Sequence, residues 1–291
     1  GEFQPNGVRW IVECASYAGV TRFLSSRTFV DEERHVVHEI REREPSVEVQ
    51  QDLQRQRRQL RRGRGTLRDD LPPRAPSTLP RKNIADFNGK PLIVWSIETA
   101  LNSAVFSRVV VSTDDEEIAE ISRKSGAETP FVREAALADD FATTADVLKD
   151  ALSKLPMHEH ACCLYPTAPM ITAANLQEAD AKIGETGADC VLSVTAYDFH
   201  PLRAFSKSED NTLAFHWPEH ELTRSQDLPE MLHDAGAFYF FNVKALLKTG
   251  KLIGQNTIGI ELPRNQAVDI DTQEDFELAR TLHKLNQEGR Q

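Results

Sequence analysis

The chain has 291 residues, of which 40% are hydrophobic and 27% are charged, and its formal net charge is -11. This composition is typical of a globular protein with one large domain or two modest ones, and no apolar run approaches the ~18 residues that span a membrane. The start of the chain lacks the basic and apolar regions of a signal peptide, so we expect a cytoplasmic protein with no membrane partner. Residues 78–291 carry 20 basic and 33 acidic side chains, which argues against nucleic acid as a partner.

Residues 1–77 differ from the rest of the chain in composition. They contain 14 arginines and no lysine, whereas residues 78–291 contain 11 lysines and 9 arginines. Few large apolar residues occur in the segment 31–68, which favours a solvated leader over a basic nucleic-acid arm. We therefore predict an atypical Arg-rich leader over residues 1–77 that is not native to the fold, followed by a folded domain over residues 78–291. Within the leader, VRWIVECA at residues 8–15 is the one good strand candidate.

From Thr78 onward, strands and helices alternate. Apolar runs predict strands at residues 108–115, 129–133 and 189–198, and a strand followed by a turn at residues 161–169. Helical periodicity with end signals predicts helices at residues 90–104, 115–128 and 173–188, and a loop followed by a helix at residues 136–155. This alternation predicts a three-layer α/β fold with a mostly parallel mixed sheet, whose ligands bind at the carboxyl ends of the strands.

Two later segments depart from this alternation. Residues 199–240 form an excursion that we expect to pack on another surface. Residues 266–285 predict a short strand with two aspartates, then a helix whose first turn contains acids. Acids in a first turn are favourable for the helix dipole alone, so they need no catalytic explanation.

The two aspartates of VDIDTQEDF are candidate metal ligands. Alternate residues of a strand share a face, so Asp269 and Asp271 should point the same way and repel each other unless a cation lies between them. Such oxygen ligands suit Mg²⁺ held together with substrate phosphates, although a solvated strand end has the same pattern. Arg133, Arg203 and Arg224 are candidates for binding carboxylate or phosphate, and an ordinary surface arginine is the alternative for each.

Six stretches occur in an order that resembles a known enzyme family. They are RKNIADFNGKPLIVWSIETA, VVVSTDDEEIAEISRKSGAE, FVREAALADDFATT, YPTAP, RSQDLPEMLHDAGAFYF and VDIDTQEDFELA. Together they resemble the cytidylyltransferases that make CMP-activated nonulosonic acids, over residues 78 to about 285. RSQDL followed by HDAGAFYF is similar to the pseudaminic acid branch, whereas the sialic acid branch tends to have Asn-Gly-Ala-Ile-Tyr there.

The resemblance implies roles for individual residues. Catalysis would fall to Lys82, Asp269 and Asp271, and the two aspartates would hold Mg²⁺ against the triphosphate of CTP. Tyr165 stands where the sialic acid branch has a glutamine. Nucleotide binding is implied for Arg74, Ser77, Asn83, Arg133, Thr144 and Tyr165, and binding of a nine-carbon sugar acid is implied for Arg203, Arg224, Gln226 and Asp234.

The implied reaction is attack by the anomeric hydroxyl of the sugar on the α-phosphate of CTP, with release of pyrophosphate. The general base is not assigned; a water or one of the aspartates is the candidate. The implied fold is a Rossmann-like, GT-A-like nucleotidyltransferase domain that forms homodimers through the excursion. The alternatives are the same reaction with sialic acid, and a nucleotide- or sugar-binding pseudoenzyme.

The phosphate-binding loop departs from the family pattern. The family opens with a buried strand and then Pro-Ala-Arg-Gly-Gly-Ser-Lys, whose glycines let backbone N–H groups approach the phosphates. Here residues 72–77 read PPRAPS, and when one residue is treated as deleted, Pro72, Arg74 and Ser77 match the family pattern. Both glycines and the lysine of that pattern have no counterpart. Pro76 also lacks the N–H group that a phosphate would need. We therefore hypothesise a frame-shifted or misassembled beginning. The alternative is a genuine appended domain in which VRWIVECA replaces the lost strand.

Overall fold

The structure is a computed structural model that describes residues 8–13, 79–137, 142–208 and 210–288. Its strands are β1 (Val8–Glu13), β2 (Asp86–Phe87), β3 (Lys90–Pro91), β4 (Phe106–Ser112), β5 (His160–Leu164), β6 (Cys190–Ala196), β7 (Phe205–Lys207), β8 (Leu213–Phe215), β9 (Leu232–Asn242) and β10 (Thr257–Glu261). Its α-helices are α2 (Leu92–Ser103), α3 (Glu116–Lys124), α4 (Thr144–Ser153), α5 (Ala173–Thr186), α6 (Val243–Thr249) and α7 (Gln273–Glu288). None of the helices in these ranges combines the length and apolar character needed to cross a bilayer.

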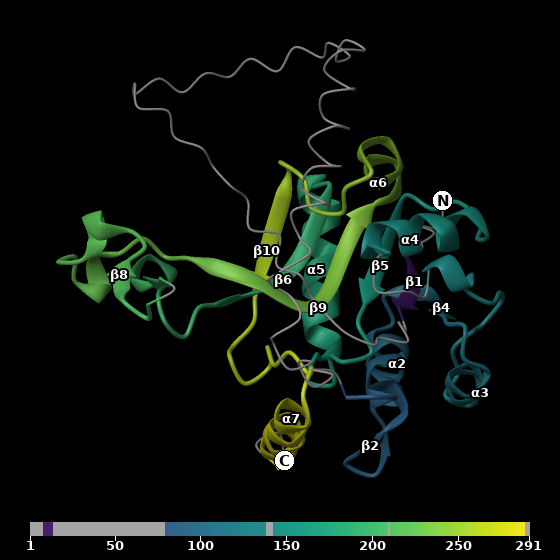
Figure 1. Cartoon of the computed structure of the whole chain (residues 1–291). Helices are drawn as coiled ribbons and strands as arrows, with labels where there is room; N and C mark the ends of the chain where they lie inside the picture. Colours follow the sequence, from purple (N-terminus) through teal and green to yellow (C-terminus); the bar gives the residue numbers. More distant parts are fainter. Residues whose placement is uncertain (1–7, 14–78, 138–141, 209, 289–291) are drawn as a thin grey trace, which may run out of the picture. The chain divides into compact units, whose positions relative to one another are not determined.

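One mixed sheet organises the described part of the chain (Figure 1). Its strand order is β10-β6-β9-β5-β1-β4. The neighbours β10 and β6, β5 and β1, and β1 and β4 are parallel, while β9 runs antiparallel to both β5 and β6. The predicted mostly parallel mixed sheet is therefore confirmed, and its antiparallel member is the strand that returns from the excursion.

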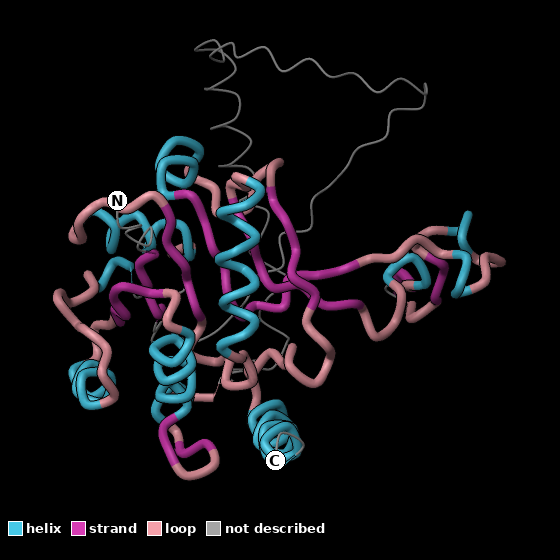
Figure 2. Tube along the Cα trace, turned by 180° about the vertical axis from the view of Figure 1, so that it is seen from behind, coloured by secondary structure: helices cyan, strands magenta, loops and turns pink. Residues whose placement is uncertain are grey.

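Helices cover both faces of the sheet, as the two opposite views show (Figure 1, Figure 2). Successive residues of a strand point to opposite faces, and the core divides accordingly. Val109 and Val111 of β4 pack with apolar residues of α2, α3 and α5, whereas Val110 packs with those of α4 and α6. The same alternation follows β5 and β9, so the sheet is buried on both sides in the three-layer arrangement that the sequence predicts.

Strand β1 lies inside the sheet, between β5 and β4. Arg9, for example, has Arg108 on one side and Ala161 on the other as its Cα partners. The strand predicted from VRWIVECA is thus confirmed over residues 8–13, in the position that the appended-domain alternative gave it. Its ladders occupy main-chain groups of β4 and β5 that would otherwise be unpaired in the interior. The boundary at Thr78 and the origin of the remaining leader stay predictions, because residues 14–78 lie outside the described ranges.

Helix ends follow local end signals. Thr172 begins α5 with a capping box, and Gly187 ends it with a φ of 63°, as the glycine after the helical pattern predicts. At the end of α3 the predicted cap is displaced by one position. Ser125 is the C-cap, and Gly126 follows it with a φ of 95°.

Two predicted strands are not strands in the described residues. Residues 129–133 make one isolated bridge, which joins Val132 to Thr113. Pro130 has no N–H to donate, so a continuous ladder cannot run through it. Residues 266–271 form a loop, because the main-chain groups of Asp271 do not pair with a strand. Its N–H donates to the carboxylate of Asp275 at 3.3 Å, and its carbonyl oxygen accepts the N–H of Leu79.

The predicted excursion is an arm that leaves the sheet after β6 and returns as β9. It contains a two-stranded antiparallel sheet in which β7 pairs with β8, and Figure 1 shows this pair beyond the far end of β9. Two large apolar side chains of the arm are almost fully exposed, Phe199 at 90% and Leu222 at 94%.

Candidate active site

Several of the predicted site residues lie at the carboxyl edge of the sheet. Tyr165 directly follows β5, and β4 ends at Ser112. Lys82 lies in a short 3-10 helix, η1 (Lys82–Ile84), that precedes α2. The loop between β10 and α7 joins this region because the carbonyl oxygen of Asp271 accepts the N–H of Leu79 at 2.9 Å. This edge is where open α/β sheets bind their ligands.

Lys82 faces one of the two predicted metal-binding acids. Its Nζ donates to the carbonyl oxygen of Ile270 at 2.5 Å and to Oδ1 of Asp271 at 3.0 Å. The lysine side chain is only 12% exposed, so water screens this ion pair less than it screens a pair on the open surface. The ammonium group is therefore held at the acids before any substrate binds. Asn83, its neighbour in η1, is buried.

Asp269 and Asp271 influence each other electrostatically, although they are not in a strand. Burial raises the pKa of Asp269, and the charges of Asp271, Asp275 and Asp234 raise it further, while Lys82 opposes them. The cluster thus carries more negative charge than one lysine offsets. Among the residues that the structure describes, no group of three or more His, Cys, Asp or Glu is placed to hold a metal ion. An ion here would take its remaining ligands from phosphate oxygens and water.

Arg133 is a buried cation at the end of β4. It is 2% exposed, and it donates from Nε to Oγ of Ser112 at 3.1 Å and from Nη2 to the Ser112 carbonyl oxygen at 2.6 Å. Its third nitrogen, Nη1, is buried without a hydrogen-bond partner in the described part of the chain. Leaving such a donor unpaired costs about 1–3 kcal/mol. Arg133 is therefore a fixed cation with one unpaired donor among the described residues.

Two tyrosines connect predicted nucleotide-binding and sugar-binding residues. The hydroxyl of Tyr165 lies 2.8 Å from Oγ1 of Thr144, and its ring lies 5.6 Å from the ring of Tyr239. The hydroxyl of Tyr239 in turn donates to Oδ2 of Asp234 at 2.7 Å. Burial raises the pKa of Tyr239, and the neighbouring Tyr165 and Asp234 add to the effect, so this hydroxyl stays protonated and remains a donor.

Asp234 lies on an irregular stretch of β9. The register against β6 shifts between Leu192 and Val194, and Gly236 has a φ of 60°. The other carboxylate oxygen of Asp234 accepts the N–H of Gly236 at 2.8 Å. The buried hydroxyl of Ser193 accepts two further N–H groups of β9, at 3.2 and 3.1 Å. The bulge therefore fixes the direction of Asp234.

The predicted sugar-binding side chains of the arm either bond to the arm itself or are exposed. Nη1 of Arg203 donates to the carbonyl oxygen of Thr223 at 2.7 Å, and to two other carbonyl oxygens of the same turn at longer distances. Arg203 thus holds the arm together. Arg224 and Gln226 are exposed and make no side-chain hydrogen bond within the described ranges. No described contact joins these three to Lys82 or to the two acids.

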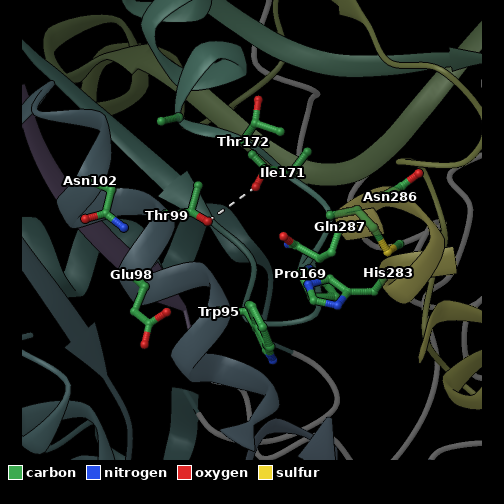
Figure 3. A pocket seen from close by; sticks show the side chains of 12 residues that line it. Trp95, Glu98, Thr99, Asn102, Pro169, Ile171, Thr172, His283, Asn286 and Gln287 are labelled. Carbon is green, nitrogen blue, oxygen red and sulfur yellow. Dashed lines mark hydrogen bonds between the residues drawn. The ribbon is translucent and has the colours of Figure 1, made fainter. Parts of the chain in front are cut away.

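A separate cavity of about 220 Å³ lies between α2, α7 and the loop that follows β5 (Figure 3). Trp95 and Thr99 line it from α2, and His283 and Gln287 line it from α7. The hydroxyl of Thr99 donates to the carbonyl oxygen of Ile171 at 3.3 Å across one wall. None of the predicted site residues that the structure describes lines this cavity, so the carboxyl edge of the sheet remains the candidate site.

Some site residues lie outside the described ranges or were not foreseen. Arg74 and Ser77 belong to the first group, so the phosphate loop stays a prediction. Tyr239 belongs to the second. Its signal was present in the sequence, since Tyr239 is part of HDAGAFYF.

Comparison with known proteins identifies the family of the chain. The sequence model of a family described as cytidylyltransferase matches residues 71–289. The chain is 43% identical over 215 residues to the pseudaminic acid cytidylyltransferase of Campylobacter jejuni, which covers 72% of this chain and 93% of that protein. It is 31% identical over 209 residues to an N-acylneuraminate cytidylyltransferase of Escherichia coli, which covers 71% of this chain and 49% of that protein.

The fold is also found in a solved structure of CMP:2-keto-3-deoxy-manno-octonic acid synthetase complexed with CTP. The TM-score is 0.53 at 18% identity, over 72% of this chain and 94% of that one. This likeness shows a shared α/β fold, and the sequence matches show the family. Because the family model matches residues 71–289 and the identity to the Campylobacter jejuni enzyme is 43%, this chain belongs to the cytidylyltransferase family of nucleotidyltransferase enzymes.

Proposed function

We propose that this protein transfers CMP from CTP to a nonulosonic acid, with pseudaminic acid as the acceptor and pyrophosphate as the leaving group. The observation that carries the proposal is the 43% identity to the Campylobacter jejuni enzyme over 93% of that protein's length. The motifs RSQDL and HDAGAFYF support the same branch. The second motif supplies both Asp234 and the Tyr239 hydroxyl that holds it, at 2.7 Å.

In the proposed reaction, the anomeric oxygen of the sugar forms a bond to the α-phosphorus of CTP, and the bond from that phosphorus to the bridging oxygen breaks. The bridging electrons leave with pyrophosphate, and the attacking hydroxyl gives up its proton to a base that we do not assign. Negative charge therefore grows on the phosphate oxygens. Lys82 places a preoriented positive charge at this edge, which stabilises such charge as it develops. Arg133 would hold the nucleotide through its unpaired Nη1.

Asp269 and Asp271 are the residues that would hold Mg²⁺. They fit the ion because both are hard oxygen ligands, and because the charges of Asp271, Asp275 and Asp234 act together on Asp269 while Lys82 opposes them. When bound, the ion would stabilise the charge of the triphosphate.

Pyrophosphate release from CTP, measured with pseudaminic acid, with sialic acid and without sugar, tests the proposal. We expect release with pseudaminic acid, and we expect a chelator to stop it. Release with sialic acid but not with pseudaminic acid would overturn the branch assignment. No release with either sugar, together with CTP binding in calorimetry, would instead support a pseudoenzyme whose loop at residues 72–77 has lost its glycines.

We further propose that the protein is a homodimer formed through the arm. Phe199, Phe205, Leu213 and Leu222 are all more than half exposed, and they occur within one segment. Large exposed apolar side chains can contribute to a surface that another protein covers.

The proposed compartment is the cytoplasm. Cys162, Cys163 and Cys190 are free and buried. Unpaired cysteines fit a reducing environment, in which structural disulfides are rare.

A further inference from the structure

Residues 79–84, which we call the strap, run along the carboxyl edge of the sheet. The N–H of Leu79 donates to the carbonyl oxygen of Asp271 at 2.9 Å. Two cationic side chains then leave the strap toward different elements. Lys82 reaches Asp271, with Nζ 3.0 Å from Oδ1, and Arg81 reaches the beginning of α3. The strap is therefore tied at two places, to the loop that holds the acids and to a helix.

Arg81 makes its tie through two ion pairs. Its Nη1 lies 2.9 Å from Oδ2 of Asp115, and its Nη2 lies 2.5 Å from Oε2 of Glu117. Asp115 is itself fixed, because its Oδ1 accepts the N–H groups of Glu117 and Ile118 as the N-cap of α3. Burial acts to raise the pKa of Asp115, but the hydrogen bond from Ile118 and the charge of Arg81 outweigh it and lower the pKa, so the carboxylate is ionised at neutral pH.

The backbone conformation of Arg81 sets the direction of the next residue, Lys82. Arg81 has a φ of 55° and a ψ of 27°, which is the left-handed region that few residues other than glycine, asparagine and aspartate adopt. This conformation starts η1, in which the Arg81 carbonyl oxygen accepts the N–H of Ile84 at 3.1 Å. If Arg81 relaxed to an extended conformation, the next residue would turn with the peptide plane, and Lys82 would swing away from Asp271.

We propose that Arg81 is a positioning residue for Lys82. Its ion pairs with Asp115 and Glu117 hold the strap in the conformation that directs the lysine at the acids and at the phosphates of CTP. Arg81 acts through Lys82 and not on the substrate. The kinetic part of this inference rests on the proposed function, whereas the order of the strap can be measured without it.

Two substitutions at position 81 separate the side chain from the backbone. Arg81→Asn removes the guanidinium but keeps a residue that tolerates the left-handed region. Arg81→Lys keeps the charge but lacks the planar fork with which two separate nitrogens bond the two carboxylates. Hydrogen exchange of the amides of Leu79, Ile84 and Ala85 reports on the strap, because all three N–H groups are bonded within it or to Asp271. We expect exchange to be about tenfold faster in Arg81→Asn, with Arg81→Lys between it and the wild type.

Activity gives the second readout. For CTP, kcat/KM should fall about tenfold in Arg81→Asn and recover in part in Arg81→Lys, while KM for the sugar stays within about twofold. Arg123→Ala is the matched control, since Arg123 pairs with Glu116 at 2.5 Å on the same helix and is similarly exposed. This control should change neither the exchange of the strap nor kcat/KM.

Unchanged exchange in Arg81→Asn would overturn the inference whatever the activity. Faster exchange with unchanged kcat/KM for CTP would also overturn it, because the order of the strap would then have no effect on the contribution of Lys82 to catalysis. If the wild type releases no pyrophosphate with either sugar, the proposed function fails. Calorimetry with CTP then decides the role of Arg81: about tenfold weaker binding in Arg81→Asn supports it, and equal binding refutes it.

Discussion

Lys82, Asp269 and Asp271 form the smallest unit of the site. The ammonium group of Lys82 has one carboxylate and one carbonyl oxygen as partners, and the pKa of Asp269 is raised by burial and by the neighbouring acid. One positive charge thus faces two carboxyl groups. Removing one carboxylate is therefore a direct test of the metal role proposed for these acids.

Asp271→Asn should lower pyrophosphate release at least about 100-fold, because it removes a proposed metal ligand and the carboxylate that holds Lys82. The midpoint of thermal unfolding should change by no more than about 4 °C, since the main-chain bond from Leu79 to residue 271 is kept. Glu120→Gln is the control, because Glu120 pairs with Lys124 on the open surface of α3. Wild-type activity in Asp271→Asn would refute the metal role.

At the scale of single elements, the bulge in β9 has the largest effect on the site. A regular strand would continue the ladder with β6, whereas the extra residues around Gly236 direct Asp234 back toward Tyr239. Ser193 on β6 makes this possible, because its hydroxyl satisfies main-chain N–H groups that the lost ladder leaves without partners.

Ser193→Ala should therefore lower the free energy of unfolding by about 2–3 kcal/mol, since two buried N–H groups lose their acceptor. Urea denaturation measures the change. Ser153→Ala is the comparison variant, because Ser153 is exposed and bonds only the carbonyl oxygen of Asp150. It should stay within about 0.5 kcal/mol of the wild type. Equal changes in the two variants would show that the bulge does not depend on Ser193.

Asp180 on α5 makes stability depend on pH. Burial raises the pKa of Asp180 above its ordinary value of 3.8, and the charge of His160 opposes this only in part. The folded state therefore binds the proton more tightly than the unfolded state does. Stability falls as pH rises from about 3.8 through the raised pKa, and it stays lower above that range.

Asp180→Asn should raise the free energy of unfolding at pH 7 and leave it unchanged near pH 3, where both states of the wild type are protonated. Urea denaturation at the two pH values measures the difference. Glu185→Gln on the same helix serves as the control, because Glu185 is exposed. An equal gain at both pH values would mean that the carboxylate charge is not the cause.

Elements with complete local signals could be predicted, and elements defined by distant partners could not. α5 has its capping box and its terminal glycine within the sequence of the helix itself. Residues 129–133 and 266–271 have strand-like composition, but their main-chain partners are loop and helix-cap groups elsewhere in the chain, such as Thr113 for the N–H of Arg133. Composition carries no information about such partners.

The same distinction holds within the site. Motifs identified Lys82 and Asp271 because the two lie in short, recognisable stretches. The contact of Arg81 with Asp115 joins residues 34 positions apart, so no local pattern could reveal it.

At the scale of the whole molecule, the arm carries the two most exposed large apolar side chains of the described residues, Phe199 and Leu222. Leu222→Glu should convert the proposed dimer to a monomer at micromolar concentration, because burying a leucine contributes about 2 kcal/mol and a buried unpaired charge is strongly unfavourable. Analytical ultracentrifugation measures the outcome. Leu247→Glu on α6 is the control, because this leucine is 46% exposed but lies outside the arm. Dimers that persist in Leu222→Glu would place the interface elsewhere.

The position of β1 also affects how the protein folds. Val8 pairs with Phe106, and Arg9 pairs with Ala161, so both ladders of this strand join segments far apart along the chain. A ribosome makes β1 before either neighbour exists, and the gap between β4 and β5 can close only after β5 has emerged. Contacts of such long sequence separation form slowly, because chain entropy is lost before the ladder stabilises them. Until then two strand edges stay open to other chains, so dilute conditions should favour correct refolding.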